Sequence, residues 1–232
     1  YMVILITQMH VSPLPLLIIR RCFSSFVFGE EHLPVFQSHL KELPLRKLRS
    51  PTDKRAAVFV PLCNVDGEPS LLFTKRSDNM RKHSGQVSFP GGGIEEQDNG
   101  CLIRCAIRET EEELGLAPNR FDNQLIPLGP YHETLSSSSI TVTPIIGYIK
   151  HFNIETMSPN EEVDTIFTLR ITDLLDPLKQ SSKSIQVPGL LHPSRMQQKV
   201  YTAGQWPVWG LTSYITEHIL REVVQLHEKQ VI

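Results

Sequence analysis

Three glutamates crowded into one short segment constrain the fold of this chain more than any other feature. In "RETEEELGL", residues 108–116, Glu109, Glu112 and Glu113 stand at positions i, i+3 and i+4. If the segment is helical, their carboxylates share one side of the helix near its C-terminal end, where the helix dipole also disfavours negative charge. The fold must therefore provide a positive charge beside them.

A helical wheel predicts that this acidic face borders the hydrophobic core. At about 100° per residue, the apolar residues of 101–115 form a stripe that is widest in the first half of the helix. In the second half the three glutamates take over the widened arc, whereas Arg104 and Glu111 are expected to point towards water. The predicted stripe consists of Ile103, Ile107, Thr110 and Leu114, widened by Leu102, Cys105 and Ala106.

A divalent cation is the compensating charge that we expect. Glu109 and Glu113 repel each other one turn apart, and a pair between Arg108 and Glu112 relieves only part of this repulsion. Carboxylate oxygens in excess of nearby basic groups suit Mg²⁺ or Mn²⁺. A merely solvated acidic face is the alternative. A calcium-binding loop is disfavoured, because the chain lacks the alternating Asp/Asn pattern of such loops.

The composition excludes several functional classes. The 232 residues suffice for one sizeable domain or two small ones, and 40% of them are hydrophobic. The formal net charge of -2 provides no general basic field for nucleic acid. The four cysteines form no CxxC pair and the histidine spacing suggests no zinc site, so we expect buried free thiols and a reducing compartment.

Hydrophobic periodicity predicts a mixed α/β architecture. Apolar runs at 56–65 and 71–77 flank a glycine-containing turn and predict a β-hairpin, followed by a Gly/Pro-rich loop over 80–93. The helix should run from about Gly100 to Leu114 and stop at Gly115. Further strands are expected at 125–131 and 140–149, mixed strand and helix signals at 161–175, and an amphipathic helix at 210–228. This order predicts a mixed sheet sandwiched by helices.

The N-terminal 29 residues differ from the rest of the chain. They contain no Asp or Glu, are largely apolar and carry Arg20 and Arg21, which is typical of a mitochondrial presequence. Polar residues and prolines interrupt the apolar run, so we expect no membrane span. Residues 30–54 are interpreted as a linker or an N-terminal helix, and 55–232 as the main folded domain. The ending "KQVI" differs from a peroxisomal Ser-Lys-Leu type signal.

The segment 91–116, "GGGIEEQDNGCLIRCAIRETEEELGL", resembles the Nudix box. Six residues match the Arg-Glu, Glu-Glu and Gly-apolar core of that signature, while Thr110 stands where an apolar residue is usual. The upstream half departs from the pattern: counted from Gly92, Asp98 falls at the acid position, but nine residues instead of seven then precede Arg108. The matching residues are Arg108, Glu109, Glu112, Glu113, Gly115 and Leu116.

A second motif, "LLFTKRSDNMRKHSGQVSFPGG" at 71–92, is similar to the signature that precedes the box in coenzyme A diphosphatases of the Nudix superfamily. Together the two motifs cover about 45 residues, and the wider resemblance covers roughly 55–225. The matching residues of the second motif are Leu72, Thr74, Arg76, Ser77, Arg81, Gly85, Phe89, Pro90, Gly91 and Gly92.

The resemblance implies a Nudix fold, which is an α/β/α sandwich, and metal-dependent hydrolysis of coenzyme A to 3′,5′-ADP and 4′-phosphopantetheine. It implies that Glu109, Glu112 and Glu113 bind Mg²⁺ or Mn²⁺, that Arg108 orients them, and that the partner is a small molecule. Glu161 and Glu162 are candidate general bases. The expected substrate-binding residues are Lys75, Arg76, Arg81, Gly91 and Gly92. Hydrolysis of another nucleotide, such as ADP-ribose, and non-catalytic binding on the same fold are the alternatives.

Overall fold

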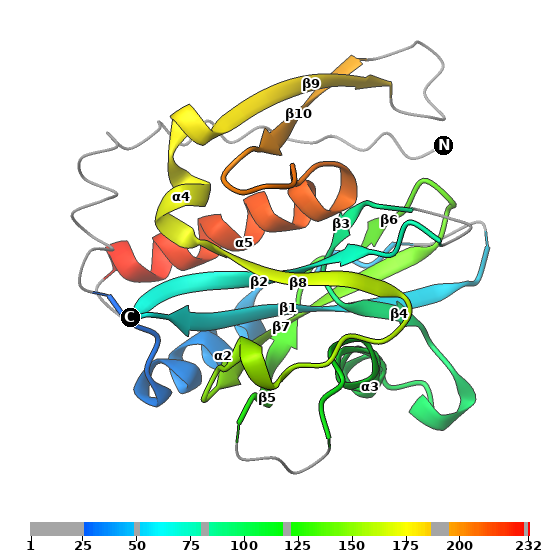
Figure 1. The fold of residues 1–232 in the computed structure, drawn as a ribbon, viewed down its shortest axis with the longest axis horizontal. Helices are drawn as coiled ribbons and strands as arrows, with labels where there is room; N and C mark the ends of the chain where they lie inside the picture. The colour runs from blue at the N-terminus through cyan, green and yellow to red at the C-terminus, as the bar shows by residue number, and fades with distance from the viewer. Residues whose placement is uncertain (1–25, 49–51, 80–83, 118–121, 187–194, 230–231) are drawn as a thin grey trace.

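A mixed β-sheet with helices on both faces forms the body of the protein (Figure 1). The computed structural model describes residues 26–48, 52–79, 84–117, 122–186, 195–229 and 232. The strands of the sheet run in the order β3-β2-β1-β7-β5, and β8 pairs with β2, β4 with β1 and β6 with β7. Strands β1 and β7 are parallel, whereas the other pairs are antiparallel. This arrangement confirms the predicted fold class.

The described residues form strands, α-helices and short 3₁₀ turns with the following bounds. The strands are β1 Arg55–Val65, β2 Glu68–Arg76, β3 Val87–Ser88, β4 Gly91–Gly93, β5 Gln124–Pro130, β6 Thr134–Leu135, β7 Thr141–Lys150, β8 Val163–Arg170, β9 Gln180–Gln186 and β10 Arg195–Tyr201. The α-helices are α2 Leu33–Glu42, α3 Leu102–Leu114, α4 Ile171–Leu175 and α5 Gly210–Glu228. The described residues also contain the 3₁₀ turns η1 Glu30–His32, η2 Glu96–Asp98, η3 Ile154–Thr156 and η4 Pro177–Lys179.

The hairpin of β1 and β2 confirms the prediction, but its second strand begins earlier than expected. Val65 pairs with Glu68, so Asp66 and Gly67 alone make the turn. Both have positive φ angles, 51° and 77°, which is the geometry of the two-residue turn that best matches the twist of paired strands. The segment 161–175, whose signals were mixed, is strand β8 followed by the short helix α4.

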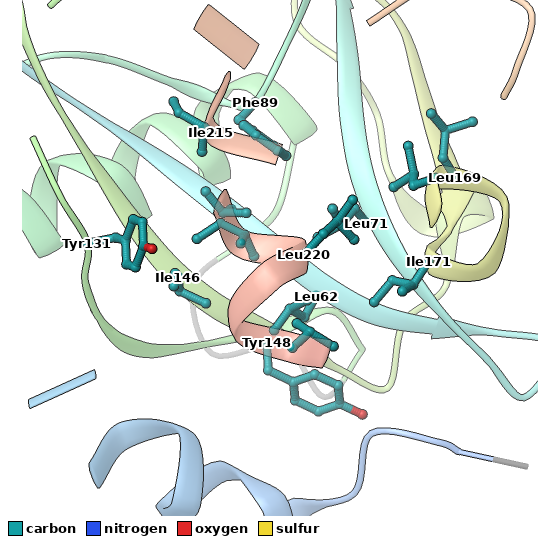
Figure 2. Packing of buried hydrophobic residues seen from close by; sticks show 14 of the residues in the cluster. Leu62, Leu71, Phe89, Tyr131, Ile146, Tyr148, Leu169, Ile171, Ile215 and Leu220 are labelled. Atoms are coloured by element: carbon teal, nitrogen blue, oxygen red, sulfur yellow. The ribbon is translucent and has the colours of Figure 1, made fainter. Parts of the chain in front are cut away.

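Alternation along the central strands divides the core between two helices. Val60 and Leu62 of β1 join the cluster that α5 covers, whereas Phe59 and Cys63 join the cluster under α3. Figure 2 shows Ile215 and Leu220 of α5 packed beside the sheet residues of the first cluster. Helices α5 and α3 thus lie on opposite faces of the sheet (Figure 1). No helix in the described part of the chain has the length and apolar character needed to cross a bilayer.

The N-terminal part of the described chain packs onto the sheet. Residues 30–54 contain helix α2, which lies against β5. The presequence expected over 1–29 lies outside the described residues except for its last four. Of these, Phe26 and Phe28 are buried in the core, and Phe28 exchanges backbone hydrogen bonds with the side chain of Asn64.

Strands β9 and β10 form a separate two-stranded sheet that the sequence analysis did not predict. The sequence of β9, "QSSKSIQ", has too few apolar residues to show a strand period. The hairpin is tied to the start of α5, where Gln198 hydrogen-bonds both backbone groups of Gly210.

Helix α3 ends where the sequence predicts, at Gly115. This glycine adopts the left-handed conformation, with φ 63°, and its N–H and that of Leu116 both donate to the carbonyl of Glu111. A Cβ atom at Gly115 would collide with the backbone of Ser158. The backbone N–H of Ser158 in turn donates to the carbonyl of Leu114, at 3.0 Å. The helix end therefore docks directly on the loop that precedes β8.

We predict that Gly115→Ala destabilises the protein more than Gly100→Ala. Both glycines have positive φ, 63° and 74°, but a Cβ at Gly100 meets nothing within 4 Å. Each alanine should cost about 1–2 kcal/mol for its left-handed conformation, and Gly115→Ala a further 1–3 kcal/mol for the collision. Urea denaturation measures both free energies of unfolding. Equal losses for the two variants would show that Ser158 does not constrain the helix end.

Candidate active site

The acidic end of α3 borders the core, as the helical wheel predicts, although unequally for the three glutamates. The side chain of Glu113 is 4% exposed, that of Glu109 17% and that of Glu112 52%. The buried face of α3 also differs from the predicted apolar stripe by a rotation about the helix axis. Of that stripe, Cys105, Ala106, Thr110 and Leu114 are buried, whereas Leu102, Ile103 and Ile107 are only partly so. The expectation that Glu111 points into water is wrong, because this residue is half-buried, whereas Arg104 is exposed.

Arg108 connects Glu109, Glu112 and Gly93 through one guanidinium group. Its Nη1 lies 3.0 Å from Oε1 of Glu109 and 3.2 Å from Oε2 of Glu112. Its Nη2 donates to the carbonyl oxygen of Gly93 at 3.2 Å. The predicted pair with Glu112 is confirmed, and Arg108 fixes the orientation of Glu109 as well.

Asp98, whose correspondence to the Nudix box the spacing left open, holds Arg108 from the other side. Its two oxygens accept from Nε and Nη2 of Arg108, each at 3.0 Å. The carboxyl group is almost fully buried and also accepts from the backbone N–H of Glu95. The Arg108 guanidinium keeps the pKa of Asp98 below its ordinary value. Turn η2 and the left-handed Asn99 (φ 49°) accommodate the longer spacing.

The glycines of β4 allow the strand to pass close beneath α3. Gly91 has φ 153°, and a Cβ there would collide with the backbone of Ala57 and Val58 in β1. A Cβ on Gly92 would overlap the carboxyl group of Glu109. Of these two residues, both predicted to contact substrate, Gly92 therefore lies against the acidic end of the helix and Gly91 against β1.

Of the predicted basic residues, Arg76 belongs to the carboxylate cluster and Lys75 does not. Arg76 lies with Nη1 3.5 Å from Oε1 of Glu113 and Nη2 3.2 Å from Oε2 of Glu162. The ammonium group of Lys75 contacts Asp164 at 2.9 Å and Asp78 at 3.4 Å instead. Arg81, the third predicted residue, lies outside the described residues.

The loop 157–162 brings one of the two predicted general bases to the site. The N–H of Asn160 donates to the carbonyl of Glu113, and the carbonyl of Glu162 accepts from the N–H of Ser77 at 2.8 Å. Both glutamates are exposed, but Glu162 also contacts Arg76 through its side chain. The sequence alone did not distinguish Glu161 from Glu162. The distinction depends on how the loop docks on α3 and β2.

Burial raises the pKa of Glu113 to about 8, against the opposing charge of Arg76 and with the help of Glu109. Burial also raises the pKa of Glu109, which Arg108 opposes. Two acids that resist ionisation side by side are a common feature of sites that receive a cation.

The residues fit a divalent cation by the chemistry of their donors. Oxygen Oε2 of Glu113 is buried and has no hydrogen-bond partner among the described residues, and a carboxylate oxygen in this state favours a cation. As the side chains stand, no three His, Cys, Asp or Glu residues of the described chain gather closely enough to hold a metal ion. Arg108 holds Glu109 and Glu112, whereas Arg76 holds Glu113. A cation that binds one of these carboxylates therefore competes with the arginine that contacts it.

A carboxylate-rich helix end beside a glycine strand, on a sheet covered by helices, defines a hydrolase of diphosphate bonds. The chain belongs to the Nudix family: the NUDIX domain model matches residues 53–185. Members of this family act on small-molecule substrates such as nucleoside diphosphate derivatives and generally use Mg²⁺ or Mn²⁺.

Two similar curated proteins come from bacteria of the genus Yersinia. An uncharacterized Nudix hydrolase NudL of Yersinia pestis (strain Pestoides F) is 38% identical over 178 residues, covering 75% of this chain and 82% of the relative. The protein of the same name from Yersinia pseudotuberculosis serotype O:1b (strain IP 31758) has the same identity and coverage. Among solved structures, a MutT/nudix family protein from Enterococcus faecalis has a TM-score of 0.49 at 16% identity, covering 86% of this chain and 76% of that one.

We predict that Glu113 makes the metal-free protein less stable as the pH rises. A carboxyl group whose pKa is raised on folding, from 4.5 to about 8, stabilises the fold fully below the unfolded pKa, and this contribution is lost as the pH rises through the folded pKa. In EDTA, the free energy of unfolding of the wild type relative to Glu113→Gln should fall by about 2–3 kcal/mol between pH 6 and 9.

The measurement is urea denaturation of both proteins at several pH values, with and without Mg²⁺. Mg²⁺ should raise the free energy of unfolding of the wild type more at pH 9 than at pH 6, because protons and metal compete for the same carboxylate. A difference between the two proteins that does not change with pH would contradict the assignment.

Proposed function

We propose that this protein hydrolyses the diphosphate bond of coenzyme A and its derivatives. The products are 3′,5′-ADP and 4′-phosphopantetheine, or its acyl form. The observation that carries the proposal is the direct contact between the two sequence motifs: Arg76 of the 71–92 motif lies against Glu113 of the Nudix box. Gly92 of the same motif lies against the carboxyl group of Glu109. The motif typical of coenzyme A diphosphatases thus forms one wall of the hydrolytic site.

Different residues of the chain have different roles in the proposed hydrolysis. Glu109, Glu112 and Glu113 are the ligands for Mg²⁺ or Mn²⁺, which when bound neutralises diphosphate oxygens and lowers the pKa of water. Arg108 holds Glu109 and Glu112 in position. The carboxylate of Glu162 accepts the proton from the attacking water, because its loop is hydrogen-bonded to both α3 and β2.

The resemblance also favours a location. The resemblance extends to a mitochondrial member of the subfamily, nucleoside diphosphate-linked moiety X motif 8, and residues 1–29 have the composition of a presequence. We propose a mitochondrial location on these two grounds. Fluorescence imaging of the full chain fused at its C-terminus to a reporter, with and without residues 1–25, tests it.

The proposed reaction is tested by mass spectrometry of the products formed from coenzyme A in H₂¹⁸O, with and without Mn²⁺. We expect both products only with the metal, and ¹⁸O on the phosphate of one of them, which identifies the phosphorus attacked. Rates with acyl-CoA and ADP-ribose as competing substrates decide between the proposal and another Nudix specificity. Tight binding of coenzyme A without products in Mn²⁺ would favour a non-catalytic binding protein.

We predict that Glu112→Gln and Glu113→Gln each lower turnover by orders of magnitude while the fold survives, because each removes a negatively charged oxygen ligand. Glu111→Gln is the matched control: it lies on the same helix, removes the same charge and should keep a rate close to that of the wild type. Near-normal rates in both test variants would contradict the assignment of the metal ligands.

We predict that Glu162→Gln lowers kcat by about 10²-fold or more, the usual contribution of a general base, whereas Glu161→Gln has little effect. The two variants remove the same charge from adjacent positions of one loop, so they separate a local role from a general electrostatic one. Protonation of the general base lowers kcat at low pH. This fall should be lost only in Glu162→Gln. Similar losses in both variants would exclude Glu162 as the proton acceptor.

A further inference from the structure

Arg76 joins two acids that belong to different elements of the site. Its guanidinium contacts Glu113 of α3 through Nη1 and Glu162 of the loop before β8 through Nη2. Its own backbone is fixed in β2, where its N–H donates to the carbonyl of Gln86 at 2.9 Å. The side chain is 18% exposed, so its charge acts on Glu113 with little screening by solvent.

The contact between Arg76 and Glu113 is weaker than the other arginine contact in the site. Arg108 binds both oxygens of Asp98 at 3.0 Å, in the two-bond geometry that suits a permanent pair. Arg76 approaches one oxygen of Glu113 at 3.5 Å, and the other oxygen has no hydrogen-bond partner among the described residues. The second partner of Arg76, Glu162, is 53% exposed. Arg108 is thus held firmly and Arg76 loosely.

We propose that Arg76 is an exchangeable counter-ion of Glu113: it neutralises this glutamate in the metal-free protein, and the divalent cation displaces it. A divalent cation carries twice the charge of a guanidinium and can also use the unpartnered oxygen of Glu113. The released guanidinium then faces the anionic substrate, whose phosphate oxygens it fits in a two-bond geometry. This last step rests on the proposed function.

The exchange couples the cation and the substrate. While Arg76 pairs with Glu113, it opposes metal binding and is withheld from phosphate. When the metal takes Glu113, the same side chain becomes a phosphate ligand. Each ligand therefore increases the affinity of the other by the same factor. Lys75, the neighbouring cation on β2, does not take part, because it contacts Asp164 and Asp78.

The test is the affinity for Mn²⁺ alone, measured by electron paramagnetic resonance at one pH for all variants. Removing the competing charge in Arg76→Met should tighten Mn²⁺ binding at least about fivefold, the lower end of typical coupling between sites. Arg76→Lys, which keeps the charge but loses the planar fork, should lie between it and the wild type. If Arg76→Met does not fold, the comparison of Arg76→Lys with the wild type provides the test.

Arg170→Met is the matched control, because it removes one arginine from the same sheet. Arg170 pairs with Glu68 at the opposite end of β2, so its loss should leave Mn²⁺ affinity unchanged. If Arg76→Met binds Mn²⁺ as the wild type does, or more weakly, Arg76 is a structural partner of Glu113 and the proposal is overturned.

A second measurement addresses the coupling to substrate. In the wild type the KM for coenzyme A should fall as Mn²⁺ rises towards saturation, whereas in Arg76→Met KM should be higher and should fall less with Mn²⁺, because only the contact of the metal with the diphosphate remains. A KM that responds equally to Mn²⁺ in both proteins would overturn the coupling. If coenzyme A is not hydrolysed at all, the proposed function fails, but the Mn²⁺ affinities still decide the role of Arg76.

Discussion

Burial of negative charge at the C-terminal end of α3 is the constraint on which the rest of the structure depends. Glu113 is almost fully enclosed and Glu109 is largely so, and each carboxylate in such a place needs a partner. One partner, Arg108, comes from the helix itself, while the other, Arg76, comes from the end of β2. The ends of the helix and of the strand must therefore meet, and the loop before β8 closes over both.

Close backbone approach makes this meeting possible. Gly92 leaves room for the carboxyl group of Glu109, and Gly115 lets the end of α3 touch the backbone of Ser158. The same contacts satisfy carbonyl groups that a helix end leaves unpaired, since the N–H groups of Ser158 and Asn160 donate to them. The glycines of the Nudix box thus serve packing around charged groups as much as conformational freedom.

Local patterns predicted the elements of this fold better than they predicted its contacts. Helix α5 has the predicted bounds and α3 ends at the predicted glycine, because periodicity and stop signals act over a few residues. The role of Asp98 stayed open because a turn of unforeseen shape places it on Arg108. The choice between Glu161 and Glu162 likewise depends on a loop docking on distant elements. Strands β9 and β10, polar and without alternation, gave no signal at all.

The balance of charge explains why a hydrolase of anionic substrates keeps so many acids together. Two guanidiniums, those of Arg76 and Arg108, are shared among the six carboxylates of Glu95, Asp98, Glu109, Glu112, Glu113 and Glu162. Such a cluster repels a bare diphosphate, since like charges at short range cost free energy in a poorly screened site. On the roles proposed for these glutamates and for Arg76, a divalent cation reverses that preference, because it occupies the excess carboxylates and leaves arginine for phosphate. The negative charge would then make substrate binding depend on the metal, so that diphosphate enters only a site already equipped to cut it.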